Sequence, residues 1–331
     1  MAMIGIDVSK DKLDCFWLKD AERGTGKSKV FKNTTSEFPV LVQWLVAQTG
    51  EPVGQLHVVM EATGVYHEAL AYALHAAGTQ VSVVNPAWVR DYAKGLGVRT
   101  KTDKQDSVVL ARLGAREPLR LWQPEPTEIR TLKALLARYE AVKRDHRREL
   151  NRLEKAEITQ VSEIVVESIR TLLTELKKEQ DRLEKRIRQH IDQHPHLKHD
   201  RRLLESIPGI GPVVSALMLA VLRSRAFSSA GQCAAFLGLV PVQHESGSSV
   251  RGPARLSKAG DATVRAKLYM AAVVAIQHNP DIQRHYQRML KNGKSKMAAL
   301  GAAMRKLVHI CFGVLKHQKT YQARSATASC A

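Results

Sequence analysis

A stretch of 64 residues, 128–191, contains neither glycine nor proline. Because these two residue types end or weaken most helices, the stretch is free to form long continuous helices. Apolar residues recur along it at spacings of three, four and seven, as in helices that pack along one seam. They are Leu132, Leu135, Leu136, Tyr139 and Val142, and then Ile169, Leu172, Leu176, Leu183 and Ile187. The segment predicts a coiled-coil-like hairpin, with a break within 151–159, that serves as a solvated spacer or as a dimerising arm.

The long helical segment separates regions of different character, and a chain of 331 residues is expected to hold two or three domains. A proline-rich stretch at 118–126 predicts a boundary before the segment. We therefore expect an N-terminal domain at 1–125, a helical arm at 126–200 and a third domain at 201–331.

The N-terminal region alternates between short apolar runs and helical spacings. We expect strands at 3–6, 13–18, 29–33, 57–60 and 80–84, and helices at 37–48, 67–77, 88–95 and 107–115. Strands in series, followed by strands alternating with helices, predict an α/β domain. The region from 201 to 331 is predicted to be mostly α-helical, with interruptions at 207–212 and 241–260.

Positive charge is concentrated in the last third of the chain. The whole chain has 51 lysines and arginines against 32 acidic residues, a net charge of +19. Residues 201–331 hold 19 of the basic residues and only 4 acidic ones, whereas residues 1–125 hold 15 and 14. A region this basic requires a polyanion as partner, and nucleic acid is the first candidate.

Other features are typical of a cytoplasmic protein. The four cysteines (15, 233, 311 and 330) include no CxxC pair, which argues against a disulfide scaffold and a zinc site. No apolar run approaches the roughly 20 residues of a membrane span. The first residues include acidic side chains and lack the apolar core of a signal peptide.

Four acidic residues fall where a metal site is expected. Asp7 follows the first strand, Glu61 ends the strand at 57–60, and Asp103 and Asp106 lie three residues apart at a helix start, hence on one face. Carboxylate oxygens suit Mg²⁺, and two such ions can stabilise both the attacking and the leaving oxygens in phosphoryl transfer. This order of elements resembles ribonuclease H-like nucleases of the Holliday-junction-resolvase type.

The acidic residues also have a structural interpretation. Asp103 would then be a helix N-cap and Asp7 a solvated turn residue. Two further acidic residues nearby, Asp11 and Asp14, are interpreted as surface residues.

The sequence SIPGIG at 206–211, followed by an apolar stretch, has the form of a helix-hairpin-helix turn. Gly209 and Gly211 would let backbone amides approach a phosphate, and the next helix N-terminus favours an anion. This predicts sequence-independent contact with nucleic acid. The alternative is an ordinary tight turn between packed helices.

A Ser- and Gly-rich loop then places Ser246 close in sequence to Arg251, Arg255 and Lys258. A serine that attacks a phosphate needs nearby positive charge to stabilise the developing oxyanion. Composition by itself favours a flexible loop with phosphate-binding arginines. A basic turn that contains Lys294 and Lys296 is expected to contact backbone phosphates.

In this order the motifs resemble those of one known family. They are GIDVSK around Asp7, MEATGVY around Glu61, the pair Asn85-Pro86, KTDKQD with Asp103 and Asp106, IPGIG ending at Gly211, and ESGSSVRG around Ser246. The ordered set covers nearly the whole chain and resembles the DEDD transposases of the IS110 family of bacterial insertion sequences. The resemblance implies a RuvC-like ribonuclease H fold whose four acidic residues bind Mg²⁺, with Mn²⁺ as a substitute. It also implies a coiled-coil arm and a transposase domain whose serine nucleophile maps to Ser246, with Ser248 and Ser249 as adjacent alternatives.

The resemblance implies partners as well. The family works with a structured non-coding bridge RNA that base-pairs with donor and target double-stranded DNA. The protein cuts strands through a covalent phosphoserine link and exchanges them. Homodimers pair into a homotetramer, in which acidic cluster and serine come from different subunits.

We therefore predict an RNA-guided DNA recombinase of the bacterial cytoplasm. The alternatives are a resolvase or nuclease that uses metal-activated water, and a non-catalytic nucleic-acid-binding scaffold. A sugar-kinase-like ATPase, whose related fold opens in the same way, is disfavoured because glycine-rich phosphate loops are missing.

Overall fold

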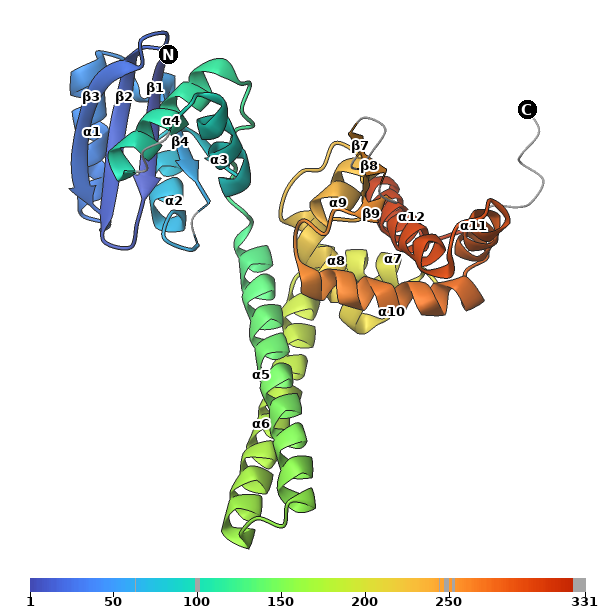
Figure 1. The fold of residues 1–331 in the computed structure, drawn as a ribbon. Coiled ribbons are helices and arrows are strands. Elements are labelled where there is room, and N and C mark those ends of the chain that lie inside the picture. The colour runs from blue at the N-terminus through green and yellow to red at the C-terminus, as the bar shows by residue number, and fades with distance from the viewer. Residues whose placement is uncertain (63, 99–101, 244, 247–249, 252–253, 324–331) are drawn as a thin grey trace. The chain divides into compact units, whose positions relative to one another are not determined.

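The computed structural model describes residues 1–62, 64–98, 102–243, 245–246, 250–251 and 254–323 (Figure 1). The chain forms two compact units, Met1–Pro124 and Glu125–Ala331. The second unit holds both the long helices and the C-terminal helices, so a separate arm domain stays a prediction.

The first unit is built on a five-stranded mixed sheet in the order β3-β2-β1-β4-β5. β1, β2 and β3 are antiparallel neighbours, and β4 and β5 run parallel to β1. The strands are β1 (Ala2–Val8), β2 (Lys12–Asp20), β3 (Thr25–Lys32), β4 (Leu56–Glu61) and β5 (Gln80–Val84). Between and after them lie α1 (Glu37–Thr49), the 3-10 turn η1 (Val53–Gln55), α2 (Glu68–Ala76), α3 (Pro86–Gly95) and α4 (Asp103–Arg116). This arrangement agrees with the predicted α/β, ribonuclease H-like domain.

Strand alternation gives the sheet two covered faces. Ile4 and Ile6 of β1 pack in the core that contains Leu41 of α1 and Leu70 of α2. The opposite face is covered by α4, whose buried residues pack against Val59 of β4.

Gly5 allows α4 to lie directly on β1. A Cβ atom at Gly5 would lie 2.0 Å from the carbonyl oxygen of Ser107 and 2.6 Å from the amide nitrogen of Ala111. Since both are backbone atoms of α4, no side chain larger than hydrogen fits without moving the helix. The close approach brings the first turn of α4 to the strand that carries Asp7.

The second unit begins with two long antiparallel helices, α5 (Thr127–Ile158) and α6 (Glu163–Gln193). Their seam buries Ile129, Leu132, Leu136, Val142, Ala156, Val166, Leu173, Leu183, Ile187 and Ile191. α5 continues to Ile158, so only the last residue of the predicted break, Thr159, lies outside it. The turn uses Gln160 at φ 50°, a conformation that no glycine or proline marks in the sequence.

Six further helices pack around one hydrophobic core with the near end of this helix pair. They are α7 (Pro195–Glu205), α8 (Pro212–Arg223), α9 (Ala230–Phe236), α10 (Ala262–His278), α11 (Pro280–Lys291) and α12 (Lys296–His317). Two short ladders pair β6 (Pro241–Val242) with β9 (Arg255–Leu256), and β7 (Glu245–Ser246) with β8 (Val250–Arg251). Among the described helices, only α12 is long and apolar enough to cross a membrane, although the sequence predicted no such run. Half of its apolar window is buried in this unit.

Candidate functional site

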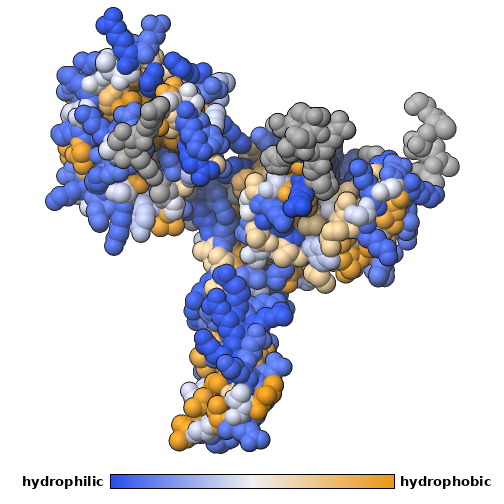
Figure 2. All heavy atoms as spheres, in the orientation of Figure 1, coloured by the Kyte–Doolittle hydropathy of each residue, from blue (hydrophilic) through white to orange (hydrophobic). Residues whose placement is uncertain are grey.

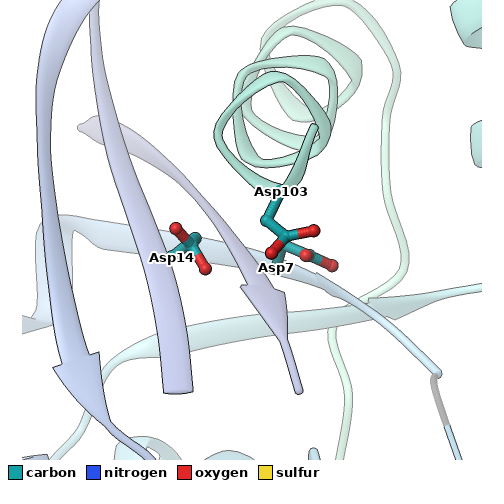
Figure 3. Close-up of side chains that lie close together, drawn as sticks. All are labelled: Asp7, Asp14 and Asp103. Atoms are coloured by element: carbon teal, nitrogen blue, oxygen red, sulfur yellow. The ribbon is translucent and has the colours of Figure 1, made fainter. Parts of the chain in front are cut away.

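Three carboxylates from three elements meet on the α4 face of the sheet. Carboxylate oxygens of Asp7 on β1, Asp14 on β2 and Asp103 on α4 lie within 4.8 Å of one another (Figure 3). Asp7 and Asp14 are directly opposite each other in the β1–β2 ladder. Residues directly opposite in a ladder point to the same face, which explains why these two converge.

The remaining predicted carboxylates are close enough to affect Asp7. Burial and then the negative charges of Asp106, Asp103, Asp14 and Glu61, in that order, together raise the pKa of Asp7 to about 6. A carboxyl group that loses its proton less readily because of neighbouring carboxylates is a sign of mutual repulsion. Glu61 and Asp106 are thus near enough to act on Asp7, although they lie outside the group of three carboxylates whose oxygens are within 4.8 Å of one another.

Two interpretations from the sequence are wrong. Asp14, expected at the surface, is only 9% exposed, because β2 places it opposite Asp7 on the face that α4 covers. Asp103 is not a helix N-cap: Thr102 caps α4, and its hydroxyl accepts a hydrogen bond from the amide of Gln105 at 3.2 Å. Asp11 is exposed, as predicted.

Lys12 is a further member of the site that sequence reasoning missed. Its ammonium nitrogen donates a hydrogen bond to Asp103 Oδ2 at 2.6 Å and lies 3.1 Å from Asp14 Oδ2. These hydrogen bonds raise the pKa of Lys12. Lys12 and Asp14 are two residues apart on one strand, and this spacing places them on the same face.

A cleft of about 620 Å³ adjoins the cluster. Glu61 and Asp106 line it together with Arg90 and Lys94 of α3. Asn85 is the N-cap of α3, and its side-chain oxygen accepts a hydrogen bond from the amide of Ala87 at 2.8 Å. The cleft is thus lined by both carboxylates and cations. The sequence signal for the cations was the i, i+4 spacing of Arg90 and Lys94, which places both on one face of a helix.

The chemistry of the cluster fits a divalent cation. Its acidic donors are all carboxylate oxygens, which are the ligands of Mg²⁺ and Mn²⁺. After burial, the neighbouring carboxylates also raise the pKa of Asp7, and a divalent cation would offset their repulsion.

Ser246 lies in a small hairpin of the second unit. It pairs with Val250, and Glu245 pairs with Arg251. The β6–β9 ladder, which includes Arg255, closes the base of this hairpin. Ser248 and Ser249, the alternatives to Ser246, lie outside the described residues.

Two glycines hold the base of the hairpin against α9. A Cβ at Gly238 would lie 2.1 Å from the carbonyl oxygen of Ala259, and one at Gly260 would lie 2.2 Å from that of Phe236. Between them Lys258, which is exposed, takes φ 56° and donates its amide to the carbonyl of Gly238 at 3.2 Å.

The two glycines of the predicted helix-hairpin-helix turn differ in their surroundings. Gly209 has φ +101°, and a Cβ there would lie 2.7 Å from the Cβ of Ala275 on α10. Gly211 is exposed and immediately precedes α8, with no atom within 4 Å of such a Cβ. Packing against α10 therefore accounts for Gly209, and Gly211 is the open position. Lys294 and Lys296 are exposed at the turn between α11 and α12.

Family models for a DEDD transposase and for a transposase of the IS116/IS110/IS902 family match residues 4–157 and 201–287. The pilin gene-inverting protein of Moraxella bovis is 35% identical over 97% of this chain and 98% of its own length. The chain belongs to the IS110 family of transposases. This IS110-family protein is thus a DNA transposase or recombinase, and its N-terminal unit is built on the five-stranded mixed sheet.

More distant relatives are also transposition proteins. A probable family 20 transposase of Pseudomonas aeruginosa is 27% identical to this IS110-family chain, over 80% of the chain and 85% of its own length. Among solved structures, RuvC of Thermus thermophilus is 15% identical with a TM-score of 0.28, and the match covers 37% of this chain and all of RuvC.

Proposed function

We propose that this transposase is an RNA-guided DNA recombinase in which Ser246 attacks a DNA phosphodiester. The observation that carries the proposal is the convergence of carboxylates on Asp7. The ladder that presents Ser246 within a strongly basic unit supports it. A RuvC-like resolvase that uses water needs the same carboxylates and no serine. Whether Ser246 forms a covalent link to DNA therefore decides between the two.

The metal ligands in this proposal are Asp7, Glu61, Asp103 and Asp106. Mg²⁺, or Mn²⁺ in its place, would supply positive charge that stabilises the oxyanions of phosphoryl transfer. Asp14 lies within the same cluster and holds Lys12 by an ion pair.

The covalent step forms a bond between Ser246 Oγ and phosphorus and breaks one bridging P–O bond of the DNA strand. The serine proton passes to a nearby base, and the departing oxygen takes up a proton to leave as a hydroxyl group. Arg251, Arg255 and Lys258 bind the attacked phosphate. Reversal with a different strand hydroxyl releases the serine and completes strand exchange.

The nucleic-acid partners are a structured bridge RNA and donor and target double-stranded DNA. The support is the charge of 201–331, with 19 basic and 4 acidic residues. Gly211, with Gly209, forms the helix-hairpin-helix contact, and Lys294 and Lys296 contact backbone phosphates.

The assembly is a homodimer that pairs into a homotetramer through a coiled-coil arm, which lets the acidic cluster and Ser246 of different subunits combine. Hydrophobic side chains gather at the free end of the α5–α6 hairpin (Figure 2), where Ile158, Val161, Ile164 and Val165 are exposed. Exposed apolar patches of this kind mark interaction surfaces.

Replacing the serine tests the chemistry. Ser246→Ala should bind RNA and DNA as the wild type does but form no covalent protein–DNA adduct, measured by denaturing gel electrophoresis with labelled DNA. Ser248→Ala and Ser249→Ala are the matched controls and should keep the adduct. An adduct that persists in Ser246→Ala would falsify the assignment.

Co-purification tests the guide. The protein is expressed with its native flanking DNA, and the bound RNA is sequenced. A discrete structured RNA that maps to those flanks supports guidance, whereas random fragments favour a stand-alone resolvase or a scaffold.

A further inference from the structure

The last 50 residues, 282–331, contain ten lysines and arginines and no aspartate or glutamate. Most of the described part forms α11 and α12, which pack against each other. Asp281 is the last carboxylate before this region, and it is engaged by Arg284 and by the hydroxyl of Tyr321 at 2.8 Å. No aspartate or glutamate within residues 282–331 is therefore present to neutralise the lysines and arginines of this segment.

Five side chains at the packed helices form what we call the cationic cluster: His285 and Arg288 of α11, and Arg305, Lys306 and His309 of α12. Arg288 Nη2 lies 3.1 Å from His285 Nδ1 and donates to it. Spacings of three and four residues place the members from each helix on one face.

Positively charged side chains act on both histidines. Burial lowers the pKa of His285 and then the charges of Arg288 and Lys306 lower it further. Burial also lowers the pKa of His309, followed by Arg305 and Lys306. Because Lys306 acts on both histidines, the two helices contribute to one cluster.

One polar atom of the cluster lacks a partner. His309 Nε2 is buried and makes no hydrogen bond to any described residue. A buried ring nitrogen without a partner is costly, and an acceptor oxygen from a ligand would satisfy it when that nitrogen carries the proton. An anion would relieve both the unpaired nitrogen and the repulsion among the cations.

We propose that the cationic cluster is a binding site for the phosphodiester backbone of nucleic acid, separate from the Ser246 hairpin and from Lys294 and Lys296. The proposal rests on the proposed nucleic-acid partners of the transposase. Arg288 and Arg305 offer planar guanidinium groups that bind phosphate through two hydrogen bonds, and Lys306 supplies a point charge between the helices. The chemistry recognises phosphate on DNA or on RNA.

The experiment measures binding of the full chain to a labelled duplex of about 30 base pairs and to a labelled RNA hairpin over a series of salt concentrations. The test variant is Arg305→Gln with Lys306→Gln. The matched control is Lys185→Gln with Arg186→Gln, another adjacent lysine–arginine pair, on α6, where Glu184 is its neighbour. Neither pair includes a proposed metal ligand or a residue of the Ser246 hairpin.

Affinity of the test variant should fall at least about tenfold. The slope of log affinity against log salt should become shallower by about 0.9 for each lost duplex phosphate contact and by about 0.7 for each on a single strand. The control should keep the wild-type slope. A loss confined to the duplex assigns the site to DNA, a loss confined to the hairpin assigns it to RNA, and a loss with both assigns it to their shared backbone.

Unchanged affinity and slope for both probes would overturn the proposal. If the wild type binds neither probe, the proposed function fails instead. His309→Phe, which keeps the ring shape but removes the nitrogens, provides a second test should the double variant unfold. It should weaken binding about threefold at an unchanged salt slope, and no change in affinity would count against the site.

Discussion

The carboxylate cluster of the first unit and the cationic cluster of the second differ in the sign of their charge and in how far that charge extends around them. Each brings like charges together, at Asp7, Asp14 and Asp103 in one case and at Arg305 and Lys306 in the other. The first unit is close to neutral overall, so its repulsion is local, whereas the second is basic over its whole C-terminal part. A local cluster needs a compact divalent ion, and an extended one needs a chain of phosphates.

The strongest test of this contrast removes one carboxylate. Asp103→Asn should lower strand cleavage by about 10³-fold, because several kcal/mol of charge stabilisation by the metal are lost. Binding of nucleic acid by the basic unit should stay within about twofold of wild type. Cleavage of element-end DNA and binding are measured on the same preparation, with Asp11→Asn as control. Equal losses of cleavage and binding would contradict the assignment of cleavage to the carboxylates and of nucleic-acid binding to the basic unit.

Gly5→Ala tests whether close packing builds the acidic cluster. The added methyl group would force α4 away from β1 and destabilise the first unit by about 3 kcal/mol. All four tryptophans lie in this unit, so urea unfolding followed by tryptophan fluorescence reports it selectively. Gly54→Ala is the control, since the nearest atom to its Cβ would be 4.0 Å away. Wild-type stability in Gly5→Ala would mean that α4 can move away from β1 without destabilising the first unit.

A third test uses the pKa of Asp7, which is about 6 in the folded protein against an ordinary value of 3.8. The native state therefore holds this proton more tightly than the unfolded chain. The resulting stability is complete below pH about 4 and is lost as pH rises through about 6. In EDTA, Asp7→Asn should be more stable than wild type at pH 7.5 by about 1 kcal/mol, a value reduced for partial exposure.

The difference between the two proteins should shrink toward pH 4.5, and urea unfolding at both pH values measures it. Asp11→Asn, at an exposed position, should show no such trend. A constant difference would indicate that neither burial nor the neighbouring carboxylates raise the pKa of Asp7.

The smallest expected effect concerns Lys12, whose ammonium group contacts Asp103 and Asp14. A metal ion at the cluster competes with this ammonium group, so Lys12→Gln should bind Mn²⁺ about threefold more tightly, as suits an exposed ion pair. Paramagnetic resonance of free Mn²⁺ gives the affinity. Lys10→Gln removes the same charge two residues earlier and should change it less. Weaker binding in Lys12→Gln would show that the lysine supports the metal.

Much of the fold was predictable because the sequence marks it locally. Alternating apolar residues located the strands, and the absence of glycine and proline located the long helices. Asp14 was missed because its burial depends on the β1–β2 register and on α4, which are both tertiary features. The turn at Gln160 was missed because a non-glycine residue adopts a left-handed conformation there.

The site was predictable only in part for a similar reason. Asp7, Glu61, Asp103 and Asp106 carry a recognisable order along the chain, whereas the cationic cluster is assembled from side chains on two helices that must first pack. Its signal in the sequence was compositional, the absence of carboxylates after Asp281.

The glycine contacts at the base of the Ser246 hairpin also have an entropic consequence. Gly238 and Gly260 pack backbone against backbone, and the β6–β9 ladder joins the two ends of the loop. The loop is thus already closed by the fold, so each doubling of the length of its tip costs only about 0.6 kcal/mol in closure entropy. Lengthening the tip would therefore cost little closure entropy compared with the packing that holds the base of the hairpin.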